Sequence, residues 1–202
     1  MAVEVVGFDV GETLIDETGM WTRAAAVAGV TPFTLMGVLG GLIARNRHHT
    51  ELWDTLGVEP AAATWSDDDW YPDALPCVER LRDAGYRVCA VGNTPRFVEE
   101  EIGRRLEVLG SSESWGVAKP DPAFFARLVQ ALDAAPEKIA YVGDRVDNDI
   151  APALAAGLVG VHVRRGPWGY LHEPPLEAIR IASLDELPDA LERRRLDGGA
   201  EQ

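Results

Sequence analysis

Cysteine, lysine and long apolar runs are scarce in this sequence of 202 residues. The two cysteines, Cys77 and Cys89, have neither CxxC spacing nor a neighbouring histidine, which argues against a disulfide framework and a structural zinc site. No apolar run reaches the roughly 18–20 residues that a membrane-spanning helix needs. The first ten residues lack the basic region and cleavage site of a signal peptide. We therefore expect a soluble protein of the cytoplasm.

Positive charge is also in short supply. Lysine and arginine together number 19 against 33 aspartates and glutamates, which gives a net charge of −14. A protein that binds nucleic acid through phosphate contacts, or that docks on an anionic membrane, needs the opposite balance. We therefore expect neither nucleic acid nor membrane as a partner, while the sequence does not indicate the oligomeric state.

Short apolar runs alternate with helical patterns along most of the chain. The runs end abruptly at polar residues or glycine, as strands buried on both faces do. This alternation is typical of βαβ units and predicts a parallel sheet in an α/β domain. The predicted strands are 3–8, 87–91, 139–142 and 159–163, and the predicted helices include 75–84, 123–134 and 150–156.

One long segment does not alternate. It has helical patterns over 24–30, 33–47 and 51–56 and no strong strand candidate. The segment is either a long helical crossover between two strands or a small helical insert that covers the strand ends. We favour the insert, with a core domain of residues 1–15 and 72–202 and a helical cap domain of residues 16–71. The tail after Leu191 is expected to fray at its end.

Polar residues follow the predicted strands where ligands bind in parallel α/β sheets, at the carboxyl ends. Asp9, Asn93 and Asp144 each follow a strand, and Asp149 comes shortly afterwards. Three carboxylates in one cleft repel one another unless a cation neutralises them, and Mg²⁺ with oxygen ligands is the simplest solution. Lys119, one of two lysines in the chain, would supply a compact positive charge for an anionic substrate.

Four segments in order resemble the four motifs of the haloacid dehalogenase (HAD) superfamily. The resemblance spans residues 3 to about 165 and implies a Rossmann-like α/β parallel-sheet core with a compact helical cap of type 1. It also implies an Mg²⁺-dependent hydrolase, a phosphatase that acts on a small phosphorylated metabolite through an aspartyl-phosphate intermediate. The segments are FDVGETLID at 8–16, AVGNT at 90–94, VAKPDP at 117–122 and VGDRVDNDIAPALAAGL at 142–158.

The resemblance implies a role for each residue of the candidate site. Asp9 would be the nucleophile, and Lys119 would steady both this nucleophile and the phosphoryl oxygens. Mg²⁺ would be held by Asp9, by Asp144 with help from Asp149, and by the backbone carbonyl of Gly11. The residues that would hold the substrate phosphate are Thr13, Gly92, Asn93 and Thr94.

The first two motifs depart from the family pattern. Gly11 stands where the family has a second aspartate, which protonates the leaving group and then activates water. Glu12 stands at the usual glycine, and Gly92 at the usual serine or threonine. Either Glu12 and Thr94 take over from one residue away, so that Glu12 is catalytic, or these functions are reduced and the enzyme is slow.

Two alternatives of other kinds remain. The chain is alternatively a degenerate HAD domain that binds Mg²⁺ and a phosphorylated ligand, or a protein partner, without useful turnover. As a minor alternative it is a haloacid dehalogenase, which also lacks the second aspartate and uses no metal. Asp144 and Asp149 favour metal and phosphate over dehalogenation. The sequence does not indicate which substrate is used.

Overall fold

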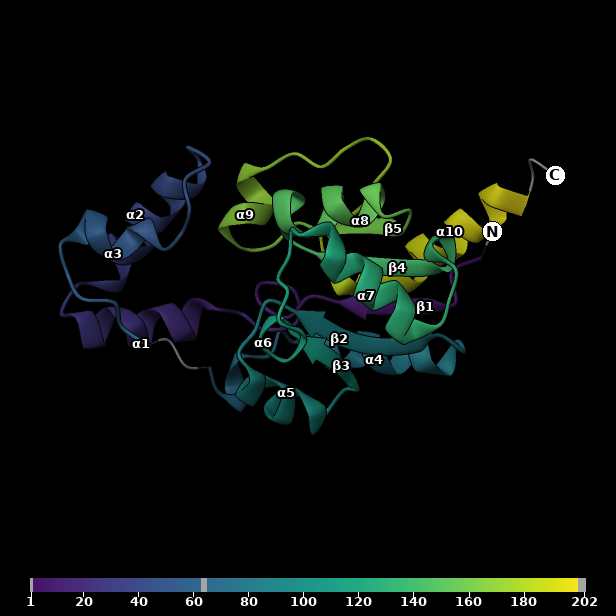
Figure 1. Ribbon diagram of the computed structural model, residues 1–202, viewed down its shortest axis with the longest axis horizontal. Coiled ribbons are helices and arrows are strands. Elements are labelled where there is room, and N and C mark those ends of the chain that lie inside the picture. Colours follow the sequence, from purple (N-terminus) through teal and green to yellow (C-terminus); the bar gives the residue numbers. More distant parts are fainter. Residues whose placement is uncertain (1, 63–64, 200–202) are drawn as a thin grey trace.

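The computed structural model describes residues 2–62 and 65–199 (Figure 1). Six parallel strands form one sheet in the order β3-β2-β1-β4-β5-β6. Strand β1 pairs with β2 on one side and β4 on the other, so the chain proceeds outwards in both directions from the middle of the sheet. The parallel α/β sheet predicted from the sequence is confirmed. The strands are β1 (Val5–Phe8), β2 (Arg87–Gly92), β3 (Val108–Ser111), β4 (Ile139–Gly143), β5 (Val159–Val163) and β6 (Ile179–Ile181).

Apolar residues on both faces of the sheet explain why its central strands read as continuous apolar runs. In β4 all five residues are buried, and alternate side chains enter opposite cores. Ala140 and Val142 join one core, formed with α4 (Ala74–Asp83), α5 (Arg96–Gly103) and α10 (Leu187–Gly199). Ile139 and Tyr141 join the other, formed with α7 (Pro122–Leu132) and α8 (Ala151–Ala155). The sheet is therefore covered by helices on both faces.

Local sequence signals mark the start of α7. Asp121 caps α7 by accepting a hydrogen bond from the backbone N–H of Ala123 at 2.8 Å, and Pro122 is the first helical residue. A π-helical turn over Val146–Ile150 precedes α8. The core helices are α4 (Ala74–Asp83), α5 (Arg96–Gly103), α6 (Ser112–Trp115), α7 (Pro122–Leu132), α8 (Ala151–Ala155), α9 (Gly166–Leu171) and α10 (Leu187–Gly199).

The expectation that the tail after Leu191 frays at its end stays a prediction. Helix α10 continues to Gly199, and the rest of the tail, residues 200–202, lies outside the described residues.

Among the described residues, three α-helices lie between β1 and α4, in the segment where the sequence breaks its alternation. They are α1 (Thr18–Ala28), α2 (Pro32–Ile43) and α3 (Glu51–Leu56), and Figure 1 shows them in purple and blue at one side of the molecule. Their buried residues, among them Leu35, Ile43 and Leu52, form an apolar cluster that Trp168 of α9 joins. Trp168 thereby ties this helical insert to the sheet domain.

The apolar character of the insert does not produce a long straight helix. Among the described residues no single helix is long and apolar enough to cross a membrane. Helices α1 and α2 reach the required length and composition only when taken together, and the chain bends by 112° between them.

Candidate active site

A buried ammonium group joins two carboxylates at the carboxyl end of the central strands. Lys119 Nζ lies 2.6 Å from Oδ1 of Asp9 and 2.5 Å from Oδ1 of Asp149. Burial opposes the charge on this amine, but the two carboxylates raise the pKa of Lys119 well above its usual value. Lys119 is therefore a positively charged ammonium ion at ordinary pH. Its two ion pairs bring together Asp9 and Asp149, which are far apart in the sequence.

Backbone contacts fix the positions of these groups. Asp9 directly follows β1, and its N–H donates to the carbonyl of Val142 in β4 at 2.9 Å. The side chain of Asn93, directly after β2, accepts from the backbone N–H of Lys119 and donates to its carbonyl, both at 2.8 Å. Asn93 was expected to help hold phosphate, and in the structure its amide is engaged in holding the loop that carries Lys119.

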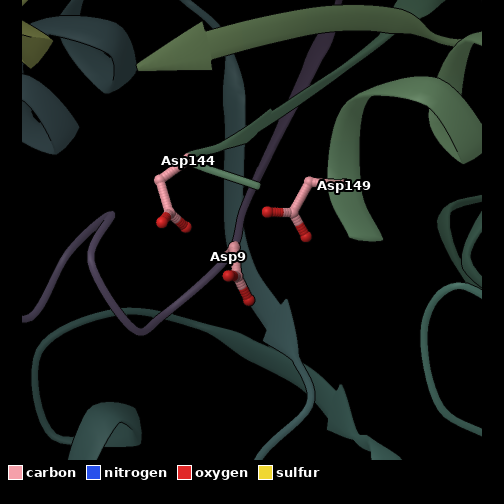
Figure 2. Close-up of side chains that lie close together, drawn as sticks. All are labelled: Asp9, Asp144 and Asp149. Atoms are coloured by element: carbon pink, nitrogen blue, oxygen red, sulfur yellow. The ribbon is translucent and has the colours of Figure 1, made fainter. Parts of the chain in front are cut away.

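Asp144 completes a cluster of three carboxylates (Figure 2). One oxygen each of Asp9, Asp144 and Asp149 lies within 4.8 Å of the others. Asp144 is 1% exposed, and among the described residues its Oδ2 has no hydrogen-bond partner. Burial and the neighbouring carboxylates raise the pKa of Asp144 well above its usual value. This unpartnered oxygen is the kind of buried polar atom that a bound cation would satisfy.

Asp149 differs from Asp144 because both of its oxygens are engaged. Oδ1 accepts from Lys119, and Oδ2 accepts from the backbone N–H of Arg145 at 3.0 Å. Burial raises the pKa of Asp149 to about 6, although Lys119 acts in the opposite direction. Its position in the π-helical turn before α8 directs the carboxylate back towards Lys119.

A cavity of about 350 Å³ opens above Asp9, Lys119 and Asp144. The helical insert and the sheet domain both line it, and large apolar side chains make up much of its wall. A pocket of this size suits a small ligand. Its apolar wall includes Met20, Trp21, Trp65, Phe97 and Trp168, and its polar wall includes His49, Thr94, Arg145 and Asn148.

Glu17 also lines the cavity, and no motif in the sequence pointed to it. Its carboxyl group occupies the space beside Gly11, because a Cβ atom added to Gly11 would overlap Oε1 of Glu17 and lie 3.1 Å from its Cδ. Trp21 Nε1 donates to Oε2 of Glu17 at 3.0 Å. Burial, together with the charge of Glu12, raises the pKa of Glu17 to about 7.

Glu12, expected as a possible replacement acid, is tied to other groups. Its Oε1 accepts from the backbone N–H of Glu17 at 2.9 Å, and its Oε2 accepts from the hydroxyl of Tyr71 at 2.6 Å. Burial raises the pKa of Glu12 above its usual value, although the hydrogen bond from Tyr71 lowers it. Glu12 has a φ of +50°, in the left-handed region that favours glycine, so these bonds hold a residue in a costly conformation.

The expected phosphate-holding residues are placed unequally. Thr94 lines the cavity, whereas Thr13 is fully buried and does not line it. Gly92 is buried beneath Asp9, and a Cβ atom at this position would overlap Oδ1 of Asp9. Because glycine has no Cβ atom, position 92 leaves space for the carboxylate of Asp9.

The chain is similar in sequence to proteins that are named as phosphatases. Over 140 residues the chain is 38% identical to a glyceraldehyde 3-phosphate phosphatase of Methanopyrus kandleri, a match that covers 60% of each protein. It is 29% identical over 149 residues to phosphoglycolate phosphatase 1 of Pseudomonas aeruginosa, which covers 70% of this chain and 53% of that relative. The match thus spans less than two thirds of either curated relative.

Similarity to solved structures supports the fold over most of the chain. A HAD phosphatase from Thermococcus onnurineus superposes with a TM-score of 0.62 at 19% identity, covering 94% of this chain and 98% of that one. The model of the haloacid dehalogenase-like hydrolase family matches residues 3–157, which contain the carboxylate cluster, Lys119 and the cavity residues up to Asn148. The chain therefore belongs to the haloacid dehalogenase-like hydrolases.

Proposed function

We propose that the chain is an Mg²⁺-dependent phosphatase that hydrolyses a small phosphorylated metabolite through an aspartyl-phosphate on Asp9. The observation that carries this proposal is the pairing of Asp9 with the buried Lys119 at 2.6 Å, at the floor of a cavity for a small ligand. The relatives named as phosphatases for glyceraldehyde 3-phosphate and phosphoglycolate support a small phosphate ester as substrate.

A divalent cation fits the carboxylate cluster. Asp144 has a buried oxygen without a partner among the described residues, and hard oxygen donors are the ligands that Mg²⁺ takes. We infer that Asp9, Asp144 and the Gly11 carbonyl would hold the ion, while Asp149 adds charge and fixes Lys119. The bound cation would neutralise the negative charge of the substrate's phosphoryl oxygens.

The chain's own residues account for the attack on phosphorus. Lys119 offsets the charge of an incoming phosphate, which otherwise repels the Asp9 carboxylate. An oxygen of Asp9 then forms a bond to phosphorus, as carboxylate nucleophiles do, and the bond from phosphorus to the alcohol oxygen breaks. Thr94 in the cavity wall and the loop after β2 would contact the phosphate.

We further propose that residues 16–71 act as a cap domain whose side chains select the substrate. Support comes from the wall of the cavity, to which this segment contributes Met20, Trp21, His49 and Trp65. The location in the cytoplasm that the sequence suggests stays a prediction.

Hydrolysis of phosphate esters by the purified chain, with and without Mg²⁺, tests the proposed function. We expect metal-dependent release of phosphate that Asp9→Asn abolishes, and beryllofluoride, a phosphoryl mimic, bound at Asp9. Binding of Mg²⁺ and phosphate without any turnover would instead support the non-catalytic alternative. Release of chloride from 2-chloropropionate without metal would support the dehalogenase.

A further inference from the structure

Four carboxylic side chains line the cavity, and two of them already have a role in the proposed reaction. Asp9 attacks phosphorus, and Asp144 belongs to the cluster that suits a cation. The reaction also needs a group that gives a proton to the departing alcohol oxygen and later takes one from water. Glu12 and Glu17 are the remaining carboxyl groups of the cavity wall.

The contacts of Glu12 make it unsuited to that role. Both of its oxygens accept hydrogen bonds, from Tyr71 and from the backbone of Glu17. A Cβ atom on Gly166 would overlap Oε2 of Glu12, so this carboxylate is packed against the start of α9. Glu12 instead fixes the backbone at Glu17, which makes it a positioning residue.

Glu17 has the opposite pattern of contacts. Its Oε2 is anchored by Trp21 at 3.0 Å, and in the part of the chain that the structure describes no group donates a hydrogen bond to Oε1. That free oxygen fills the space that a side chain on residue 11 would take. Residue 11 is two positions after Asp9, so the free oxygen lies beside the loop that carries the nucleophile.

We propose that Glu17 is the acid–base residue of this site. This proposal rests on the proposed phosphatase function. As Asp9 forms its bond to phosphorus, the bond to the alcohol oxygen breaks with its electron pair, and the Glu17 proton moves to that oxygen. Water then attacks phosphorus and gives a proton to the Glu17 carboxylate, while the bond between phosphorus and Asp9 breaks. The products are alcohol and phosphate, and both Asp9 and Glu17 return to their starting forms.

A carboxyl group in this place determines which esters are cleaved. An alkyl phosphate leaves as a strongly basic alkoxide and needs a proton, whereas p-nitrophenol leaves as a weak base and needs little help. The wild-type chain therefore hydrolyses alkyl phosphates of small alcohols, and the absence of a carboxyl group at residue 11 does not confine it to aryl esters.

Glu17→Gln tests the proposal, because glutamine keeps the size of the side chain and an oxygen for Trp21. Phosphoglycolate, p-nitrophenyl phosphate and Mg²⁺ are the probes, and Glu59→Gln, an exposed glutamate of the same insert, is the control. We expect Glu17→Gln to lower kcat for phosphoglycolate by about 10²–10⁴. With p-nitrophenyl phosphate we expect a burst of nitrophenol, since the aspartyl-phosphate forms readily and then hydrolyses slowly.

A double variant separates chemistry from misfolding. Glu17→Ala empties the space beside Gly11, and Gly11→Asp in the same chain refills it with a carboxyl group, so we expect the pair to recover at least about a tenth of the lost turnover. Suppose that the wild type is active and that Asp9→Asn abolishes this activity. Equal activity of Glu17→Gln and Glu59→Gln on both esters would then overturn the role of Glu17 but not the proposed function. Absence of any metal-dependent hydrolysis by the wild type would overturn the proposed function itself.

Discussion

Nζ of Lys119 lies 2.6 Å from Oδ1 of Asp9, and both groups are largely shielded from water. The nucleophile and the cation that screens it are therefore held together by the fold. A buried ion pair gains stability only when its geometry is good and its other hydrogen bonds are made. Here the ammonium group of Lys119 donates a second hydrogen bond to Asp149, and Asn93 fixes the backbone of Lys119.

Lys119→Ala should damage both activity and stability. It leaves Asp9 and Asp149 buried without their cation, which costs about 3–5 kcal/mol in the free energy of unfolding. It should also lower kcat by roughly 10²–10³, the usual loss on removing one stabilising group from a transition state. Urea unfolding and steady-state hydrolysis of p-nitrophenyl phosphate measure the two effects.

Lys138→Ala is the matched control for that variant. Lys138 pairs with Glu4 at 2.7 Å, but both side chains are exposed and the pair lies before β4, at the other end of the strand from Asp144. Surface pairs of this kind contribute little. Similar losses in the two variants would mean that Lys119 lies outside the active site.

Gly92→Ala should lower activity although it adds a single methyl group. The new Cβ atom would overlap Oδ1 of Asp9, so the carboxylate has to turn away and lengthen its bond to Lys119. We expect kcat to fall at least about tenfold, since small displacements of reacting groups are costly. The result is measured with the same ester under saturating Mg²⁺.

Gly37→Ala provides the comparison, since a Cβ atom there meets nothing within 4 Å. Gly37 is exposed in α2, and alanine should stabilise that helix by about 0.5–1 kcal/mol without changing kcat. If Gly92→Ala were as active as Gly37→Ala, the close packing of residue 92 on Asp9 would have no consequence for the reaction.

The sequence predicts the centre of the fold better than its edges. The four central strands are fully or almost fully buried, so their sequences are mostly apolar, and β5 has the predicted bounds. The outer strands β3 and β6 were not predicted. Val108 and Leu109 of β3 are only partly buried and a glycine follows them, while β6 has three residues with an exposed arginine in the middle. Because these edge strands are only partly buried, they do not appear in the sequence as continuous apolar runs.

The candidate site is predictable where it follows strands. Asp9, Asn93 and Asp144 are found by their position after apolar runs, and parallel pairing then brings them together. Glu17 gives no such signal, because it precedes α1 and reaches the cavity only through the turn that Glu12 and Tyr71 hold. Whether Glu12 points into the cavity depends on a φ of +50°, which the sequence does not reveal.

Asp144→Asn should weaken Mg²⁺ binding by at least about tenfold, because it removes a charged oxygen from the proposed ligand set. The same change should stabilise the metal-free protein, since burial and like charges disfavour the Asp144 carboxylate. Calorimetric titration with Mg²⁺ and thermal unfolding in a chelator measure these effects. Asp54→Asn, an exposed change on α3, is the control, and equal Mg²⁺ affinity in the two variants would contradict the proposed site.

His49 should make stability depend on pH. Its ring lies edge-on to Trp168 with the centroids 6.1 Å apart, and burial with the positive charges of His48 and Arg145 lowers the pKa of His49 to about 4. In the unfolded chain the imidazole titrates near 6.5. Between these two values the unfolded state binds more protons, so stability falls as the pH decreases from about 6.5 towards 4.

His49→Phe keeps an aromatic ring against Trp168 and removes the titrating group. The wild type should lose about 1–3 kcal/mol more than this variant between pH 7.5 and pH 4, given 1.36 kcal/mol per pKa unit and a half-buried ring. Urea unfolding of both proteins at these two pH values gives the difference, and it cancels the contributions of all other titrating groups that the two share. Parallel stability curves would show that protonation of His49 costs nothing in the folded protein, and hence that the helical insert and α9 do not shield this ring from water.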